Sequence, residues 1–160
     1  MRRLFFWGGL ALAAFVFAAP AAANTTVPVK MTITEGAIPG LVGGCPVALA
    51  DEGFCGSGQV IPLGHATTTL QFGAACVGDC DFRTVTLAGG QIFIDEVFSN
   101  PSCPGVCQPN RAEVTFGTLT DTIVGGTGTY AGATGDLTGS VSSAGPHTQT
   151  QLSGSIHFDP

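Results

Sequence analysis

The sequence predicts an all-β protein, an eight-stranded antiparallel closed β-barrel with disulfide-stapled loops. Gly, Thr, Ser and Val are abundant, and apolar residues do not recur at helical spacing in any long window. Short segments instead alternate apolar and polar residues between turns rich in Gly and Pro. About eight such segments leave two architectures, a closed barrel or a two-sheet sandwich. Glycines at apolar-face positions of the last two strands, Gly139 and Gly154, favour the barrel, because they let neighbouring strands approach closely.

Residues 1–23 have the layout of a signal peptide. Arg2 and Arg3 precede an apolar run, and a Pro-Ala-Ala-Ala segment ends at Ala23, where we expect cleavage. The apolar run is shorter than the roughly 20 residues that span a bilayer, so we expect no membrane anchor. The sequence therefore predicts one barrel domain over residues 24–160, secreted to the periplasm or the medium, with the general secretory route favoured over the twin-arginine route.

The charge balance of residues 24–160 excludes one class of partner. Three basic residues, Lys30, Arg83 and Arg111, face eleven Asp and Glu, a net charge of −8. Proteins that bind nucleic acid need clustered Lys and Arg to displace the counterions of the phosphates, and docking on anionic lipid needs the same. We therefore expect a protein that binds no nucleic acid.

All six cysteines follow the predicted leader, and an even number in an oxidising compartment indicates three disulfides. The sequence alone does not choose among the possible pairings. The spacing suggests three local pairs, Cys45 with Cys55, Cys76 with Cys80, and Cys103 with Cys107. The alternative is a zinc site built from Cys-Val-Gly-Asp-Cys and Cys-Pro-Gly-Val-Cys, with which an oxidising compartment competes.

The first strands are predicted from alternation. Val27–Glu35 carries Val, Val, Met and Ile at every second position, and Ala66–Phe72 alternates in the same way. Gln59–Leu63 is a short apolar run that we also interpret as a strand. Ala37–Gly58 is rich in Gly and Pro, so we expect a long loop with at most one short strand around Val47–Ala50.

The middle of the chain predicts a hairpin and a long strand. Phe82–Leu87 and Gln91–Phe98 flank the turn Ala88-Gly89-Gly90. After a Pro-containing loop, Arg111–Val124 resumes as a strand. Its inward residues are expected to be Ala112, Val114 and Phe116, then Leu119 and Ile123. The odd step after Phe116 implies a bulge at Gly117.

The stretch Gly125 to Gly135 reads Gly-Gly-Thr-Gly-Thr-Tyr-Ala-Gly-Ala-Thr-Gly. Its five glycines allow backbone conformations with positive φ, so the chain is expected to turn sharply here. Tyr130, the single Tyr of the protein, is flanked by small residues, which indicates a ring laid against a packed surface. Two strands follow, around Leu137–Val141 and Leu152–Phe158.

This glycine stretch, with the Gly-containing strand and the final Gly-Ser-Ile-His-Phe strand after it, resembles the signature of the allene oxide cyclase and dirigent-like barrels, secreted bacterial members included. The resemblance covers Gly58 to Phe158. It implies an eight-stranded antiparallel barrel, often oligomeric, whose interior can hold an apolar small molecule. Plant members of the group cyclise an epoxide or steer phenolic radical coupling. The short length, the leader and the three cysteine pairs depart from those members, so that chemistry is not carried over.

A catalytic barrel would need a charged or hydroxyl group inside an apolar lumen, where burial strengthens electrostatic effects. Glu96, Asp121 and Tyr130 are the candidate catalytic residues, and Arg83, Glu96, Phe116 and Tyr130 are expected to line the lumen. The simpler interpretation is that Arg83 pairs with one of the carboxylates and that Tyr130 only packs.

Other site chemistries find little support in the sequence. His65, His147 and His157 lack the spacing of metal ligands and are expected to face solvent. Asp79 and Asp81 alone make a weak calcium motif. No Ser has the surroundings of a nucleophile elbow, and no Lys follows the glycine stretch as a phosphate loop requires. We therefore predict no metal site and no cofactor.

Two functions of different classes follow, and the sequence leaves the oligomeric state undecided for both. One is a secreted binding or structural module, with a small apolar ligand in the lumen as the favoured cargo. The other is a lumenal isomerase or cyclase that uses Glu96 or Asp121 with Tyr130. An open lumen with an unengaged inward carboxylate would favour the enzyme, and a filled lumen would favour a structural module. A third interpretation is surface adhesion through the Ala37–Gly58 loop, near Asp51 and Glu52.

Overall fold

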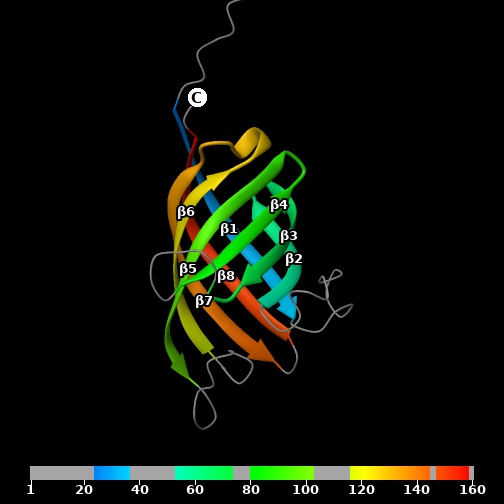
Figure 1. The fold of residues 1–160 in the computed structure, drawn as a ribbon, viewed down its shortest axis with the longest axis vertical. Helices are drawn as coiled ribbons and strands as arrows, with labels where there is room; N and C mark the ends of the chain where they lie inside the picture. Colours follow the sequence, from blue (N-terminus) through cyan, green and yellow to red (C-terminus); the bar gives the residue numbers. More distant parts are fainter. Residues whose placement is uncertain (1–23, 37–52, 74–79, 103–115, 145–146, 159–160) are drawn as a thin grey trace, which may run out of the picture.

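Eight strands pair with their neighbours in sequence order and close into one barrel (Figure 1). The computed structural model describes residues 24–36, 53–73, 80–102, 116–144 and 147–158. The strands are β1 (Thr25–Gly36), β2 (Gly53–Ile61), β3 (Gly64–Gln71), β4 (Asp81–Leu87), β5 (Gly90–Ser102), β6 (Phe116–Gly126), β7 (Thr134–Ala144) and β8 (His147–Phe158). Every neighbouring pair is antiparallel, and β8 closes the barrel on β1. The predicted eight-stranded closed antiparallel barrel is confirmed, and the two-sheet sandwich is wrong.

Alternation along β1 shows how the sequence produces one buried and one exposed face. Val29, Met31 and Ile33 are buried, whereas Lys30 and Thr32 between them are exposed. Successive side chains of a strand point to opposite faces, so the apolar set enters the barrel. The same pattern in the other strands fills the interior with aliphatic side chains, among them Leu70, Val85, Ile92, Ile94, Leu119, Ile123, Leu137, Leu152 and Ile156.

The second strand is longer than the sequence suggested, because β2 begins at Gly53, inside the expected loop. Gly58 faces β1 so closely that a Cβ there would lie 2.0 Å from the carbonyl oxygen of Thr32. Glycines that appear as loop residues in the sequence therefore serve close strand approach here. The short strand expected around Val47–Ala50 lies outside the described residues.

The prediction of a bulge at Gly117, with Phe116 in the lumen, is wrong. β6 pairs with β7 without interruption from Phe116 to Ile123. The irregularity lies on the other side of β6, where β5 shifts register between Ser99 and Ser102. Gly117 is therefore the inward residue, and the Phe98 ring fills the space that a side chain at 117 would need. Phe116 lies on the outer face and is 46% exposed.

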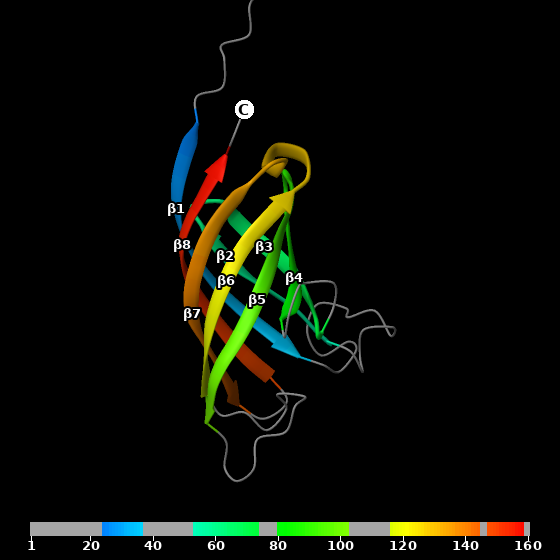
Figure 2. The same cartoon turned by 60° about the vertical axis from the view of Figure 1, so that its left-hand side comes forward.

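The glycine-rich stretch closes one end of the barrel. It contains a 3₁₀ turn, η2 (Gly128–Tyr130), which Figures 1 and 2 show beside the β4–β5 turn. The amide nitrogens of Thr127 and Thr129 donate to the carbonyl oxygens of Gln91 (2.8 Å) and Gly89 (2.9 Å). Gly128 has a φ of +60°, and a Cβ there would lie 2.2 Å from the carbonyl oxygen of Gly89. Glycine is required by the backbone conformation and by this close approach.

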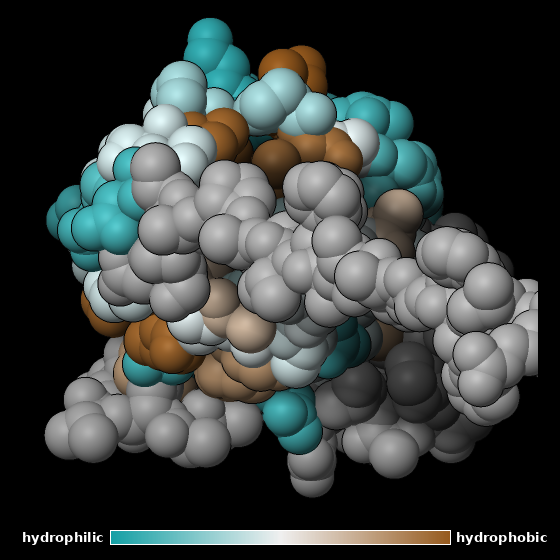
Figure 3. Space-filling view, turned by 90° about the horizontal axis from the view of Figure 1, so that it is seen from above, coloured by the Kyte–Doolittle hydropathy of each residue, from teal (hydrophilic) through white to brown (hydrophobic). Residues whose placement is uncertain are grey.

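The outer surface is mixed in character. Seen from above (Figure 3), hydrophobic residues form separate spots between hydrophilic ones. The large exposed hydrophobic residues include Ile61, Val97 and Val124, with Phe116. Among the described residues, no helix is long and apolar enough to cross a membrane.

Gly139→Ala is expected to lower the free energy of unfolding by about 1 to 3 kcal/mol, as overpacking does. A Cβ at 139 would lie 1.8 Å from the carbonyl oxygen of Gln151, so β7 and β8 would have to separate. Urea unfolding followed by circular dichroism measures the change. Ser140→Ala, at the next position of β7, is the matched control, and equal effects of the two variants would contradict the need for close approach.

Candidate functional site: a buried ion-pair cluster

Four charged side chains of the described strands lie close together inside the barrel. Glu35 lies near the end of β1, Arg83 near the start of β4, Glu96 on β5 and Asp121 on β6. Each falls on the inward face of its strand, and each is 0 or 1% exposed. Strand alternation causes this burial: Arg83, for example, shares its face with Val85 and Leu87, which are also buried.

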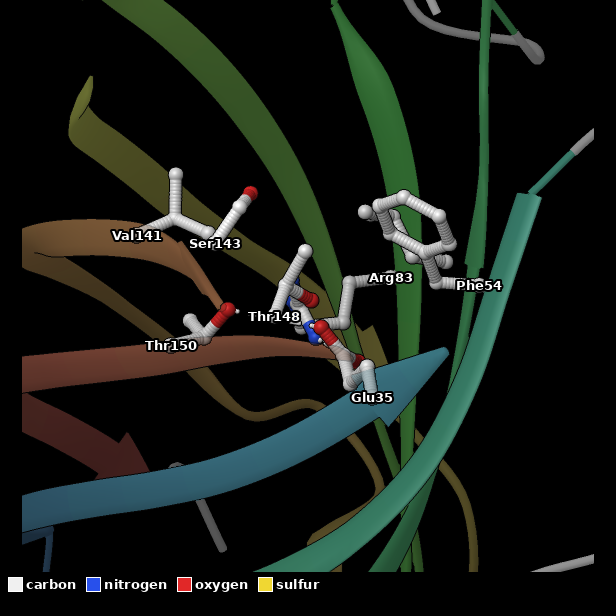
Figure 4. A pocket seen from close by; sticks show the side chains of 8 residues that line it. Glu35, Phe54, Arg83, Val141, Ser143, Thr148 and Thr150 are labelled. Carbon is white, nitrogen blue, oxygen red and sulfur yellow. Dashed lines mark hydrogen bonds and ion pairs between the residues drawn. The ribbon is translucent and has the colours of Figure 1, made fainter. Parts of the chain in front are cut away.

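The Arg83 guanidinium bridges two of the carboxylates. Its Nε donates to Glu96 Oε2 at 2.8 Å, and its Nη2 lies 2.7 Å from the same oxygen. Its Nη1 donates to Glu35 Oε1. Figure 4 shows Glu35 and Arg83 pointing toward one another inside the barrel. One side chain therefore links β1, β4 and β5 through charge-assisted hydrogen bonds, which are stronger than neutral ones.

Two hydroxyls complete the surroundings of Glu35. Thr68 Oγ1, on β3, donates to Glu35 Oε1 at 2.7 Å, and Thr150 Oγ1, on β8, donates to Oε2 at 3.3 Å. A buried carboxylate is tolerated when several donors replace the water that it loses. Glu35 has three such donors within the described strands.

The electrostatics of the cluster keep Arg83 charged. Burial by itself would lower the pKa of the guanidinium, but the carboxylates of Glu35, Glu96 and Asp121 outweigh that effect and raise it above its ordinary value. A base with a raised folded-state pKa contributes stability that is lost only as the pH rises through that pKa. Arg83 therefore stays ionised throughout the usable pH range.

The small cavity beside the cluster has room for little more than water. Figure 4 shows side chains that line it, Glu35, Arg83, Ser143, Thr148 and Thr150 among them. Its volume is about 10 Å³, which accommodates the centre of roughly one water molecule. Sites for drug-sized ligands have about 300 to 1,000 Å³. Between the described strands, the interior next to the charged cluster is thus filled.

The structure brings together only some of the candidate residues. Arg83, Glu96 and Asp121 lie in the cluster, whereas Tyr130 packs at the η2 end, 9% exposed, with its ring 6.1 Å from that of Phe158. Phe116 is on the outer face. The candidate catalytic set of Glu96 or Asp121 with Tyr130 is therefore divided between an interior cluster and an end turn.

Glu35 was missed by the sequence interpretation, although a signal was present. The residue continues the every-second-position series of Val29, Met31 and Ile33 on β1. Pairing of β1 with both β2 and β8 extends to Gly36, and this keeps Glu35 inside the barrel.

The histidines and other candidate ligands form no metal site in the described part of the chain, where no three His, Cys, Asp or Glu side chains are grouped to hold an ion. His65 and His157 are exposed, and His157 Nδ1 lies 2.8 Å from Thr26 Oγ1. His147 is half-buried, which corrects the expectation that it faces solvent. Asp79, of the weak calcium motif, lies outside the described residues.

Both described cysteines, Cys55 and Cys80, are disulfide-bonded. Cys45, Cys76, Cys103 and Cys107 lie outside the described residues. The three local pairs therefore stay a prediction.

The fold and the cluster together define a class: a closed antiparallel barrel whose interior holds packed aliphatic side chains and one buried arginine with acidic partners. No family model matches the chain, and no curated protein or solved structure matches it.

Arg83→Met is expected to lower the free energy of unfolding by about 3 to 5 kcal/mol, because it leaves Glu35 and Glu96 buried without their counter-ion. Urea unfolding at neutral pH measures the change. Lys30→Met, which removes an exposed cation from β1, is the control; a similar loss in both variants would contradict a special role for Arg83.

Tyr130→Phe is expected to change the free energy of unfolding by less than about 1 kcal/mol, whereas Tyr130→Ala should cost about 3 kcal/mol or more. The reason is that the ring packs in the core beside Phe158, and this packing does not depend on the hydroxyl. Thermal and urea unfolding of both variants measure the difference. A loss in Tyr130→Phe as large as that in Tyr130→Ala would show instead that the hydroxyl carries the contribution.

Proposed function

We propose that the protein is an exported, disulfide-stapled barrel that acts as a non-enzymatic binding or structural module. The observation that carries this proposal is the filled interior. Aliphatic side chains from all eight strands pack together in the interior. The carboxylate of Glu96 accepts a hydrogen bond from Arg83. A filled lumen is what a rigid module needs and what a lumenal enzyme lacks.

Ligand binding, in this proposal, uses the outside of the barrel. The cavity beside Arg83, at about 10 Å³, is far smaller than the apolar ligand that the sequence suggested as cargo. A groove of about 340 Å³ lies on the outer side of β1, β7 and β8. Exposed polar side chains, including Lys30, Thr32, Thr138, Gln151 and Ser153, line this groove, so it suits a polar ligand better than an apolar one.

Export and kinship belong to the same proposal. The leader-like residues 1–23 and the disulfide-bonded state of Cys55 and Cys80 support passage into an oxidising compartment. The closed eight-stranded barrel and the glycine turn that packs Tyr130 support a likeness to the allene oxide cyclase and dirigent-like barrels. Fold likeness does not carry their chemistry, since function is defined by sites.

The alternative, a lumenal isomerase or cyclase, has one observation in its favour, which is the presence of buried carboxyl groups in an apolar interior. Against it stand the engagement of Glu96 with Arg83 and the position of Tyr130 at the η2 end. Substrate would also have to displace packed aliphatic side chains.

Native mass spectrometry of the protein secreted by its own cells tests the proposal. We expect a chain that begins at Asn24, lighter by two hydrogens for each of three disulfides, with no apolar small molecule retained inside. A retained apolar ligand that stays bound until the barrel unfolds would contradict the filled-interior module. A chain that keeps residues 1–23, or that carries free thiols, would contradict export.

A further inference from the structure

One buried hydroxyl, at the end of the barrel opposite η2, has no partner among the described residues. Thr148, near the start of β8, is 6% exposed, and its Oγ1 makes no hydrogen bond within the described strands. A hydroxyl that is buried without a hydrogen bond costs free energy, because it loses the water that it binds in the unfolded chain. Most buried polar groups of folded proteins therefore have a partner, and this partner is often an ordered water molecule.

The cavity beside the ion pair of Arg83 and Glu35 borders this hydroxyl. Thr148 lines the cavity together with Glu35 and Ser143, and Figure 4 shows Thr148 between these two residues. In the strand register, Thr148 lies directly opposite Glu35 on β1 and directly opposite Ser143 on β7. The Cβ atoms of opposite residues on one face lie about 5 Å apart, so a small molecule seated at Thr148 reaches both neighbours.

The polar groups around the cavity offer both donors and acceptors. Glu35 Oε1 accepts hydrogen bonds from Arg83 and Thr68, whereas Oε2 accepts one described bond, from Thr150 Oγ1 at 3.3 Å. A carboxylate oxygen accepts about two hydrogen bonds, so Oε2 has room for a second donor. The hydroxyls of Thr148 and Ser143 donate as well as accept. A buried water molecule typically makes about three hydrogen bonds, and the cavity supplies that many groups.

The size and the charge of the surroundings select the occupant. A volume of about 10 Å³ admits one molecule as small as water and excludes larger ones. The positive charge of Arg83 disfavours a cation, and the negative charge of Glu35 disfavours an anion. In the described part of the chain, no three His, Cys, Asp or Glu side chains are grouped to hold a metal ion. A neutral molecule that both donates and accepts hydrogen bonds meets these conditions.

We propose that the cavity is a hydration site, in which one water molecule binds Thr148 Oγ1, Glu35 Oε2 and Ser143 Oγ. Arg83 and the hydroxyls of Thr68 and Thr150 already link Glu35 to β3, β4 and β8. The water extends this polar network to β7 and satisfies the buried hydroxyl of Thr148. The inference does not depend on the proposed function.

Thr148→Val tests the site, because it removes the hydroxyl and keeps the shape of the side chain. Magnetic relaxation dispersion of the oxygen-17 of water counts the water molecules that stay inside a protein for longer than it takes to tumble. We expect the count in the wild type to fall by about one in Thr148→Val. Thr120→Val, at an exposed position of β6, is the matched control and should leave the count unchanged. Equal counts in the wild type and Thr148→Val would overturn the proposal.

The direction of the change in stability separates a bound water from an unpaired hydroxyl. With the water in place, Thr148→Val leaves it with one partner fewer, and the urea concentration at the midpoint of unfolding should fall. Without a water, the substitution removes an unsatisfied polar group, and the midpoint should stay the same or rise. A fall therefore supports the proposal, and either of the other results contradicts it.

A crystal structure of the wild type covers the case in which Thr148→Val does not fold. A water molecule within hydrogen-bond distance of Thr148 Oγ1 and Glu35 Oε2 would support the hydration site. An empty cavity, or a Thr148 hydroxyl that binds another group of the protein, would overturn it.

Discussion

The contact of Arg83 with Glu35 and Glu96 is the interaction on which the interior depends. Arg83 lies 48 positions from Glu35 and 13 positions from Glu96 along the chain. Its guanidinium therefore links β4 to β1 and β5. Removing such groups from water costs several kcal/mol for each ion, and only good geometry with further hydrogen bonds offsets that cost. Thr68 and Thr150 supply those further bonds to Glu35. The cluster therefore contributes specificity of strand arrangement more surely than net stability, since the charges find their partners only when the strands take this register.

Barrel closure and the filled interior are two results of one pattern. Inward glycines at 139 and 154 lie against the backbone of the neighbouring strand, which lets the sheet curl tightly enough to close. A tightly curled barrel of eight strands has an interior that side chains can fill. Aliphatic side chains fill most of this interior, and the charged cluster occupies another part of it. The same closure leaves the outer face of the described strands as the accessible surface of the barrel.

The sequence predicted the fold well because its main signal is local. Alternation of apolar and polar residues in segments such as Ala66–Gln71 determines which side chains enter the barrel, whatever the neighbouring strand is. The same signal placed Arg83, Glu96 and Asp121 on inward faces. Errors arose where the outcome depends on distant partners. Phe116 is outside and Gly117 inside because Phe98, on another strand, occupies the space at 117. The role of Glu35 depends on Arg83, 48 positions later, and no local pattern reveals that pairing.

A double-mutant cycle between Arg83 and Glu35 tests the account most directly. Arg83→Met, Glu35→Gln and the double variant are compared with the wild type by urea unfolding at neutral pH. The account predicts that the sum of the losses in the two single variants exceeds the loss in the double variant. The difference, which is the coupling free energy, should be about 1 to 3 kcal/mol. A coupling near zero would show that the two side chains do not interact in solution and would contradict the buried ion pair as the organising contact of the barrel.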